Sequence, residues 1–275
     1  MRVWGRACCV ETYPKSINMS MTNPVLEQIH QHRSIRQYKS DLVSREMIET
    51  IVVAGQRAAT SSNLQAYACV AVSDAAKRAE LARLCGNQDH INQAPIFLAW
   101  CADLSKLDYA CALRGHPHVG NYVENFIIAT VDVALVMQNA ALAAESLGLG
   151  ICYIGGLRDH TREVIQLLGL PHYMFPISGM TVGVPNDNPI IRPRLPLPAV
   201  LHWESYSNDG LDQALQEYDV AMVNTGIYNN RQVAVPGNPG VMEDYGWTEH
   251  SARRVSRPVR TDLREVLHEQ GFELK

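Results

Sequence analysis

The chain has 275 residues, of which 47% are hydrophobic and 19% are charged, and its formal net charge is −4. This is the composition of a globular protein, and it argues against a disordered or fibrous chain. Because the net charge is small, no long-range field attracts nucleic acid or an anionic membrane surface; we expect neither as a partner, and any anion site has to be local.

Residues 1–21 contain a single short apolar run, Ala7 to Val10, which is too short for the core of a signal peptide. We interpret them as a leader that is disordered or that precedes the true start, Met19 or Met21, and we expect the folded domain to cover residues 22–275. The seven cysteines form no C-x-x-C pair, which favours buried, reduced thiols of a cytoplasmic protein over a disulfide framework.

The first half of the folded region alternates helices and strands. Proline following Asn23 predicts the start of a short helix, and Ser44 predicts the N-cap of a second helix. Ser73-Asp74 predicts the start of a third helix. This helix ends at Leu84, shortly before Gly86. Continuous apolar runs predict strands at 67–72 and 96–101.

The longest predicted helix runs from about Tyr122 to Leu147. Its apolar residues surround most of the cylinder, so it belongs in the middle of the fold. Polar residues such as Asp132 and Glu145 argue against a membrane span. After it we expect a strand at 151–154, a helix at 161–168, a strand at 178–184, a proline-rich extended arm, one more helix beyond Leu211, and an irregular tail with 236–240 as an exposed loop.

The segment His32-Arg33-Ser34-Ile35-Arg36 brings two guanidinium groups, an imidazole and a hydroxyl together, which suits a phosphate dianion. Arg192 and Arg194 flank a proline that keeps the chain extended, so both can reach one ligand. The alternative is that all of these are solvated surface charges. The hydroxyl run at 60–63 can likewise bind a ligand or simply terminate a helix.

The glycines at 148, 150, 155 and 156 do not form a dinucleotide-binding turn, because the first pair follows a helix and precedes a strand, the reverse of the required order. They more readily let a flat ligand approach the backbone. His116-Pro-His118, with Cys111 and His90, matches no zinc spacing, and we predict no metal site. A cysteine hydrolase lacks any local nucleophile motif.

Several blocks together resemble the FMN-dependent nitroreductases, in the branch of NADPH-dependent oxygen-insensitive nitroreductases and flavin reductases. The resemblance extends from Asn23 to the C-terminus. Its blocks are His-Arg-Ser-Ile-Arg at 32–36, Thr-Ser-Ser-Asn-Leu-Gln-Ala-Tyr at 60–67, Gly-Asn-Gln at 86–88, Glu-Ser-Leu-Gly-Leu-Gly at 145–150 leading to Gly-Gly at 155–156, and Arg-Pro-Arg-Leu-Pro at 192–196.

The resemblance implies an α+β fold with a mixed central sheet flanked by helices, and an intertwined homodimer with FMN at the interface. It implies that the phosphate and the pyrimidine edge are held by His32, Arg33, Ser34, Arg36, Arg192 and Arg194. It also implies that Ser61, Ser62 and Leu64 line the site across the interface, that Gln88 bonds the ring, and that Tyr153, Ile154, Gly155 and Gly156 pass close to the isoalloxazine.

The resemblance further implies that hydride passes from NADPH to FMN, and then two electrons pass to a nitro compound, a quinone or a free flavin in a ping-pong cycle. No side chain acts as a nucleophile; the protein orients the ring and supplies positive charge. Two departures bear on the nucleotide. Residues 232–246 look like an insertion, and Thr225 stands where a basic residue is expected, so Arg231 is the candidate for the 2′-phosphate and NADH is a possible donor.

Two other functions fit the same residues. One is a dedicated flavin reductase that supplies reduced FMN to another enzyme. The other is a flavin-binding redox sensor with little turnover. The sequence identifies neither the physiological oxidant nor the role of His116 and His118.

Overall fold

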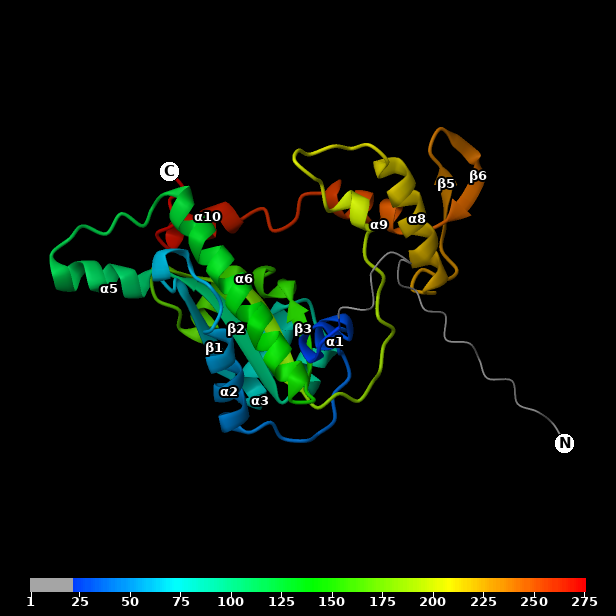
Figure 1. The fold of residues 1–275 in the computed structure, drawn as a ribbon. Coiled ribbons are helices and arrows are strands. Elements are labelled where there is room, and N and C mark those ends of the chain that lie inside the picture. Colours follow the sequence, from blue (N-terminus) through cyan, green and yellow to red (C-terminus); the bar gives the residue numbers. More distant parts are fainter. Residues whose placement is uncertain (1–21) are drawn as a thin grey trace. The chain divides into compact units, whose positions relative to one another are not determined.

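The computed structural model describes residues 22–275, so the predicted leader, residues 1–21, lies outside the described residues. The chain divides into two compact units (Figure 1). We call Pro24–Pro189 with Val259–Lys275 the core unit, and Ile190–Pro258 the arm unit. The expectation of one domain over 22–275 stays a prediction.

The core unit is built on a four-stranded sheet in the order β1-β2-β4-β3. Its strands are β1 (Tyr67–Val72), β2 (Ile96–Asp103), β3 (Gly150–Ile154) and β4 (Met174–Gly183). The α+β class is confirmed, but the sheet is antiparallel at all three pairings among the described residues, where a mixed sheet was expected. The mixed sheet was an implication of the resemblance, and sequence periodicity could not correct it, because periodicity marks where strands lie and leaves their relative direction open.

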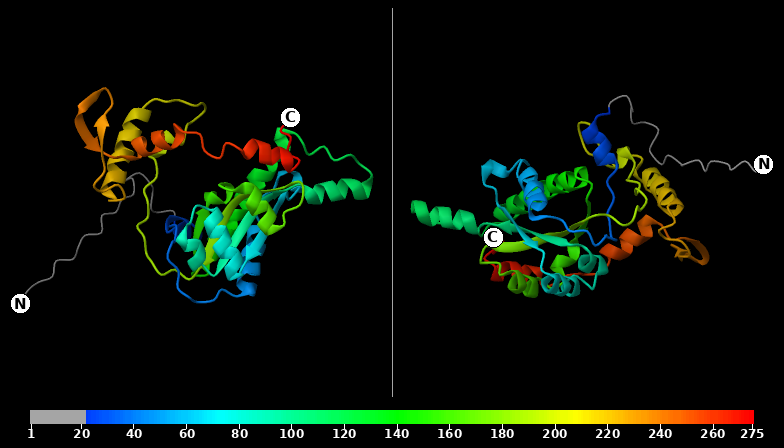
Figure 2. Two further views of the ribbon diagram at one scale, coloured as in Figure 1. Left: turned by 180° about the vertical axis from the view of Figure 1, so that it is seen from behind. Right: turned by 90° about the horizontal axis from the view of Figure 1, so that it is seen from below.

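Helices cover both faces of this sheet, as Figures 1 and 2 show. Alternate residues of β2 point to opposite faces: Leu98 and Trp100 belong to one apolar cluster, Phe97 and Ala99 to another. The first cluster is closed by helices α2 (Arg45–Gly55) and α6 (Val123–Ser146), the second by α3 (Ala75–Leu84) and α7 (Thr161–Leu168). The remaining elements of this unit are α1 (Pro24–His30), η1 (Ser61–Asn63), α4 (Asp89–Gln93), α5 (Ser105–Arg114), η2 (Gly155–Arg158) and α10 (Leu263–Glu269).

The predicted helix starts are confirmed where side chains cap them. The Ser44 hydroxyl accepts a hydrogen bond from the Met47 N–H at 3.2 Å, and the Asp74 carboxylate accepts one from the Lys77 N–H at 2.8 Å. At the far end of α6, Gly148 takes φ of +77°, which a residue with a side chain rarely adopts. These local signals fix the ends of α2, α3 and α6.

Helix α6 is, among the described helices, the one long and apolar enough to match a membrane span. It packs against α2 and the sheet, and Val133, Val136 and Ala140 are fully buried in that cluster. It is therefore a core helix, as predicted from the apolar residues around most of its cylinder. The side of α6 that faces away from the sheet carries partly exposed apolar residues, among them Ile127 and Val131.

The sequence did not predict helices α4, α5 and α10. Helix α5 has no buried residue and extends away from the sheet in Figures 1 and 2. Because Leu107 is its one side chain that packs against an apolar cluster of the core unit, no apolar stripe reveals the helix in the sequence. Helix α10 buries only Val266 and Leu267, against the end of the sheet that carries Phe175.

The arm unit corrects the expectation of an irregular tail. It contains η3 (Leu197–Ala199), the predicted helix α8 (Leu211–Asn224), a hairpin of β5 (Gln232–Val235) and β6 (Asn238–Asp244), and α9 (Trp247–Val255). The predicted loop at 236–240 is exposed, but residues 238–240 belong to β6. Pro236-Gly237 is the hairpin turn, with Gly237 at φ +78°, so the turn residues were identified and the strand pairing was missed.

The five cysteines in the described part of the chain are all thiols, while Cys8 and Cys9 lie outside it. Burial raises the pKa of the Cys85 thiol to about 12, with a smaller contribution from Asp159, and raises that of Cys101 to about 12. Thiols with such pKa values stay protonated and unreactive near neutral pH. The prediction of buried, reduced cysteines is confirmed for Cys85, Cys101 and Cys152, whereas Cys69 and Cys111 are partly exposed.

Candidate functional site

The segment His32–Arg36 runs along the open edge of the sheet beside β3. The Ile35 N–H donates to the Ile151 carbonyl at 2.8 Å, and the Lys39 N–H donates to the Val184 carbonyl at 2.9 Å. Gly150 makes this approach possible, because a Cβ there would lie 2.5 Å from Ile35 Cγ1. The glycine and the backbone bonds together hold the polar segment next to the strand that leads to Gly155 and Gly156.

His32 is held by the end of helix α6. Its Nδ1 lies 2.6 Å from Glu145 Oε1, and the exposed fractions of the two side chains are 24% and 9%. A carboxylate only accepts, so Nδ1 carries the proton and Nε2 remains available to a ligand. The second carboxylate oxygen, Oε2, is buried and has no hydrogen-bond partner among the described residues.

The other residues of the segment differ in exposure. Arg33 donates to Gln31 and to Asn188, Ser34 is half-buried, and Arg36 is exposed. Burial, and secondly the charge of Arg36, lowers the pKa of His90. Positive charge is therefore present at this edge, with Arg36 free of hydrogen bonds to the described residues.

Directly after β3 the chain passes through two glycines, of which Gly155 is half-buried and Gly156 is buried. A Cβ at Gly156 would lie 2.7 Å from the Cys85 carbonyl oxygen and 2.8 Å from Gln88 Nε2, so only glycine fits. The Gln88 amide is fixed by donating to the Cys85 carbonyl at 2.6 Å. Tyr153 donates to Gln138 at 3.0 Å. The structure thus brings Gln88 next to Gly156 after β3, while the roles of Gln88, Tyr153, Ile154, Gly155 and Gly156 toward FMN stay a prediction.

Sequence reasoning missed a pair of arginines beside these glycines. A Cβ at Gly155 would lie 3.8 Å from a terminal nitrogen of Arg158 and 3.9 Å from one of Arg260. Arg260 pairs with Asp159 at 2.7 Å, and Arg158 donates to the Ile177 carbonyl. Burial, and secondly the charge of Arg260, lowers the pKa of Arg158. Arg158, Arg260 and Asp159 together carry a net charge of +1. The two arginines are about a hundred positions apart in the sequence, so no local pattern indicates that they meet.

The loop with Ser61, Ser62 and Leu64 is held at a different place on helix α6. Asp132 is fully buried, and its carboxylate accepts from the Ser61 N–H at 3.0 Å and the Ala66 N–H at 3.1 Å. At 1.5 Å per residue, Asp132 and Glu145 are about 20 Å apart along the helix. Within one chain, the serine loop and the His32 segment therefore lie on separate parts of the molecule.

Arg192, Arg194 and Arg231 belong to the arm unit, and all three are exposed. The stretch between the first two is steadied by Tyr218, whose hydroxyl donates to the Pro193 carbonyl at 3.1 Å, and an Arg194 N–H donates to the Arg192 carbonyl at 3.1 Å. Arg231 lies over the Tyr245 ring. The role of these arginines stays a prediction.

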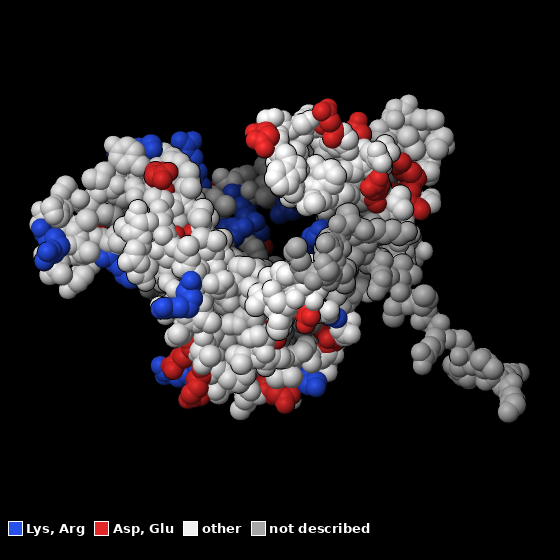
Figure 3. All heavy atoms as spheres, viewed as in Figure 1, with Lys and Arg blue, Asp and Glu red and all other residues white. Residues whose placement is uncertain are grey.

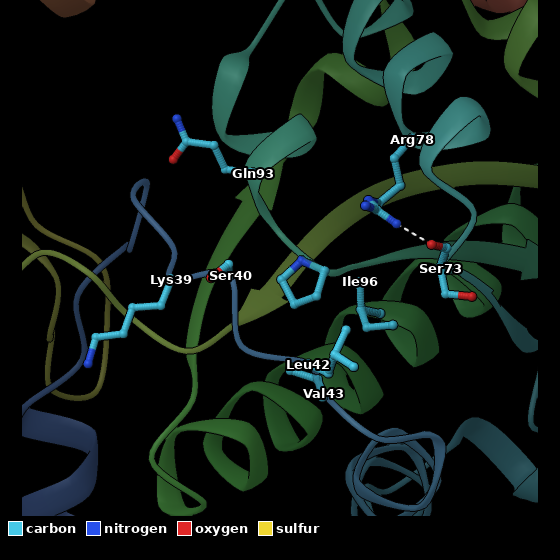
Figure 4. Close-up of a pocket in the computed structure, with 9 residues that line it drawn as sticks. Lys39, Ser40, Leu42, Val43, Ser73, Arg78, Gln93 and Ile96 are labelled. Carbon is cyan, nitrogen blue, oxygen red and sulfur yellow. Dashed lines mark hydrogen bonds between the residues drawn. The ribbon is translucent and has the colours of Figure 1, made fainter.

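Figure 4 shows a cavity elsewhere in the core unit. It has a volume of about 250 Å³ and is lined in part by Lys39, Leu42 and Arg78. The dashed line marks the hydrogen bond from Arg78 to the Ser73 carbonyl. None of the predicted site residues lines this cavity, so it is separate from the candidate site.

The histidine loop at 116–118 makes no metal cluster. His118 Nδ1 lies 3.1 Å from Asp108, and its ring meets Tyr173 edge-on with centroids 4.7 Å apart. Among residues 22–275 the structure contains no group of three or more metal-binding side chains. Over the face of the core unit seen in Figure 3, basic and acidic side chains are interspersed, so charge there is local.

Comparison with known proteins gives one consistent result. Residues 29–184 match the nitroreductase family, and residues 192–275 match the nitroreductase family C-terminal domain. The FMN reductase (NADPH) of Bacillus subtilis is 35% identical over 255 residues, which cover 91% of this chain and 98% of that protein. The oxygen-insensitive NADPH nitroreductase of Salmonella typhimurium is 34% identical over 254 residues, with coverage of 91% and 98%.

The fold agrees with these matches. The solved structure of B. megaterium NfrA2 is 38% identical and superimposes with a TM-score of 0.84, over 92% of this chain and all of that chain.

Proposed function

The chain belongs to the nitroreductase family, and on that premise we propose that it is an FMN-dependent oxidoreductase that passes electrons from NADPH to nitro compounds, quinones or free flavin. The observation that carries the proposal is the cluster at the end of β3. There the bare backbone at Gly155, the Gln88 amide packed against Gly156 and two arginines adjoin the polar segment at 32–36.

This cluster fits FMN in chemistry and shape. The flat ring needs close backbone approach, which the half-buried Gly155 provides, because it has no side chain and a Cβ built there would meet no atom nearer than 3.8 Å. The phosphate needs several donors, and His32, Arg33, Ser34 and Arg36 offer them in one short segment. FMN, when bound, supplies the hydride chemistry. The surplus positive charge of Arg158 and Arg260 stabilises negative charge that develops beside Gly155.

We propose that the site is completed in a homodimer. Ser61, Ser62 and Leu64 are anchored about 20 Å along α6 from the His32 segment, so they serve a site of the partner subunit. Val123, Ile127, Val131 and Leu135 form an apolar stripe at four-residue spacing on α6, each 41–50% exposed. Such a stripe on a core helix marks an interface.

Replacing Leu135 by glutamate is expected to convert the dimer to a monomer and to remove bound FMN, because an unpaired charge would be buried in the interface. Sedimentation velocity and the flavin content of the purified protein measure both effects. Leu42→Glu is the matched control, since Leu42 is 91% exposed in a loop. If Leu135→Glu stays dimeric, the stripe is not the interface.

The purified protein is expected to absorb near 450 nm and to lose that band under anaerobic conditions when NADPH is added, faster than with NADH. A colourless protein that FMN cannot reconstitute contradicts the proposal. Rapid NADPH oxidation with an added quinone excludes the sensor with little turnover. Comparing free FMN with a nitroaromatic as acceptor tests the dedicated flavin reductase. The reduced thiols are consistent with a cytoplasmic enzyme, which we also propose.

A further inference from the structure

The cavity in Figure 4 lies where three segments of the core unit meet. Residues 39–43 continue from the His32 segment, and residues 93–96 run from the end of α4 into β2. Ser73 and Arg78 come from the turn after β1 and from the start of α3. The volume of about 250 Å³ is close to the lower end of the range for small-molecule sites.

The apolar part of the cavity wall is anchored in the core. Val43 and Ile96 are buried members of the apolar cluster that α2 and α6 close. Pro95 lies close over Gly183 of β4, since a Cβ on that glycine would be 2.7 Å from Pro95 Cδ. The cavity therefore has a preformed apolar floor, which suits the hydrocarbon part of a ligand.

Arg78 supplies a cation with unused donors. It is half-buried, and one of its terminal nitrogens donates to the Ser73 carbonyl. Its Nε is buried and has no hydrogen-bond partner among residues 22–275. A buried donor without an acceptor costs free energy. A carboxylate would supply that acceptor, because its two oxygens match two neighbouring nitrogens of a guanidinium.

The remaining charge around the cavity is also positive. Lys39 is exposed, and within the described part of the chain its ammonium group forms no hydrogen bond or ion pair. Its side chain extends away from Arg78 in Figure 4, so Lys39 contributes attraction at the rim and Arg78 is the anchor. Among the described residues no aspartate or glutamate lines the cavity. The nearby Asp74 carboxylate is engaged as the N-cap of α3.

We propose that this cavity binds a small organic carboxylate, with the carboxylate on Arg78 and the hydrocarbon part against Val43, Pro95 and Ile96. The apolar floor favours an organic acid over inorganic phosphate, which has no hydrocarbon part to bury. The inference is independent of the proposed function, because none of the residues proposed to hold the flavin lines the cavity.

The test measures binding of cyclohexanecarboxylate to the full-length protein by isothermal titration calorimetry, with and without added FMN. Cyclohexanecarboxamide is the uncharged probe of nearly the same shape. We expect the carboxylate to bind about 10-fold or more tightly than the amide, the effect of a hydrogen bond to a charged group. Inorganic phosphate should not displace it. Arg78→Gln should abolish the difference between the probes, and Lys39→Gln should reduce it less.

Lys77→Gln is the matched control, since Lys77 is exposed, adjacent on α3 and outside the cavity lining. Arg78→Lys keeps the charge and loses the paired donors, so it should bind the carboxylate with intermediate affinity; this separates loss of the site from misfolding. No binding by the unmodified protein, equal affinity for the two probes, or unchanged affinity in Arg78→Gln overturns the inference. The last result would place the acid elsewhere on the protein.

Discussion

Replacing Asp132 by alanine is expected to lower the free energy of unfolding by about 3 kcal/mol, because two backbone donors in a water-excluded place lose their acceptor. The carboxylate is fully buried and accepts from the Ser61 and Ala66 N–H groups at 3.0 and 3.1 Å. Urea unfolding followed by circular dichroism measures the loss.

The loop that Asp132 holds leads into strand β1 and carries the serines proposed to reach the partner's flavin. Loss of the Asp132 carboxylate therefore also disturbs those serines. Ser62, at φ +48°, already has a conformation that needs support. Asp132→Asn keeps one acceptor and most of the shape, and should cost less than the alanine variant. Glu124→Gln on the exposed start of α6 is the control. A loss for Asp132→Ala no larger than that of the control would show that the loop is held by other contacts.

Sequence reasoning succeeded where a local signal decides the structure. Ser44 and Asp74 cap helices within their own turn, and the predicted bounds of β1 and α7 are those of the structure. Each depends on neighbours within a few residues, which is what periodicity and capping rules describe. The resemblance of several sequence blocks predicted the nitroreductase family, and the comparisons confirm it.

It failed where partners distant in sequence decide the outcome. Asp132 and Glu145 were taken only as polar interruptions of an apolar helix, although one holds the serine loop and the other holds His32. Arg158 and Arg260 meet beside Gly155 although about a hundred residues separate them in the sequence. The hairpin at 232–244 was missed because its strands are short and β6 is wholly exposed, so it lacks the alternation that identifies a half-buried strand.

Removing the His32 imidazole is expected to weaken FMN binding about 10-fold to 100-fold, the effect of one hydrogen bond to a charged phosphate. Glu145 orients that imidazole through a 2.6 Å contact from deep in the end of α6. Glu145→Gln should therefore also weaken FMN binding, although it never touches the phosphate. Titration of the FMN-free protein with FMN, followed by quenching of flavin fluorescence, measures both variants.

The double variant separates orientation from direct contact. If Glu145 acts through His32, then adding Glu145→Gln to His32→Ala should cause little further loss, because the ring that it orients is already gone. Glu49→Gln, whose side chain is 60% exposed on α2 and pairs with Arg45, is the control for changing a paired glutamate. Fully additive losses would mean that the two residues act independently. Unchanged FMN affinity in His32→Ala would remove the segment at 32–36 from the proposed phosphate site.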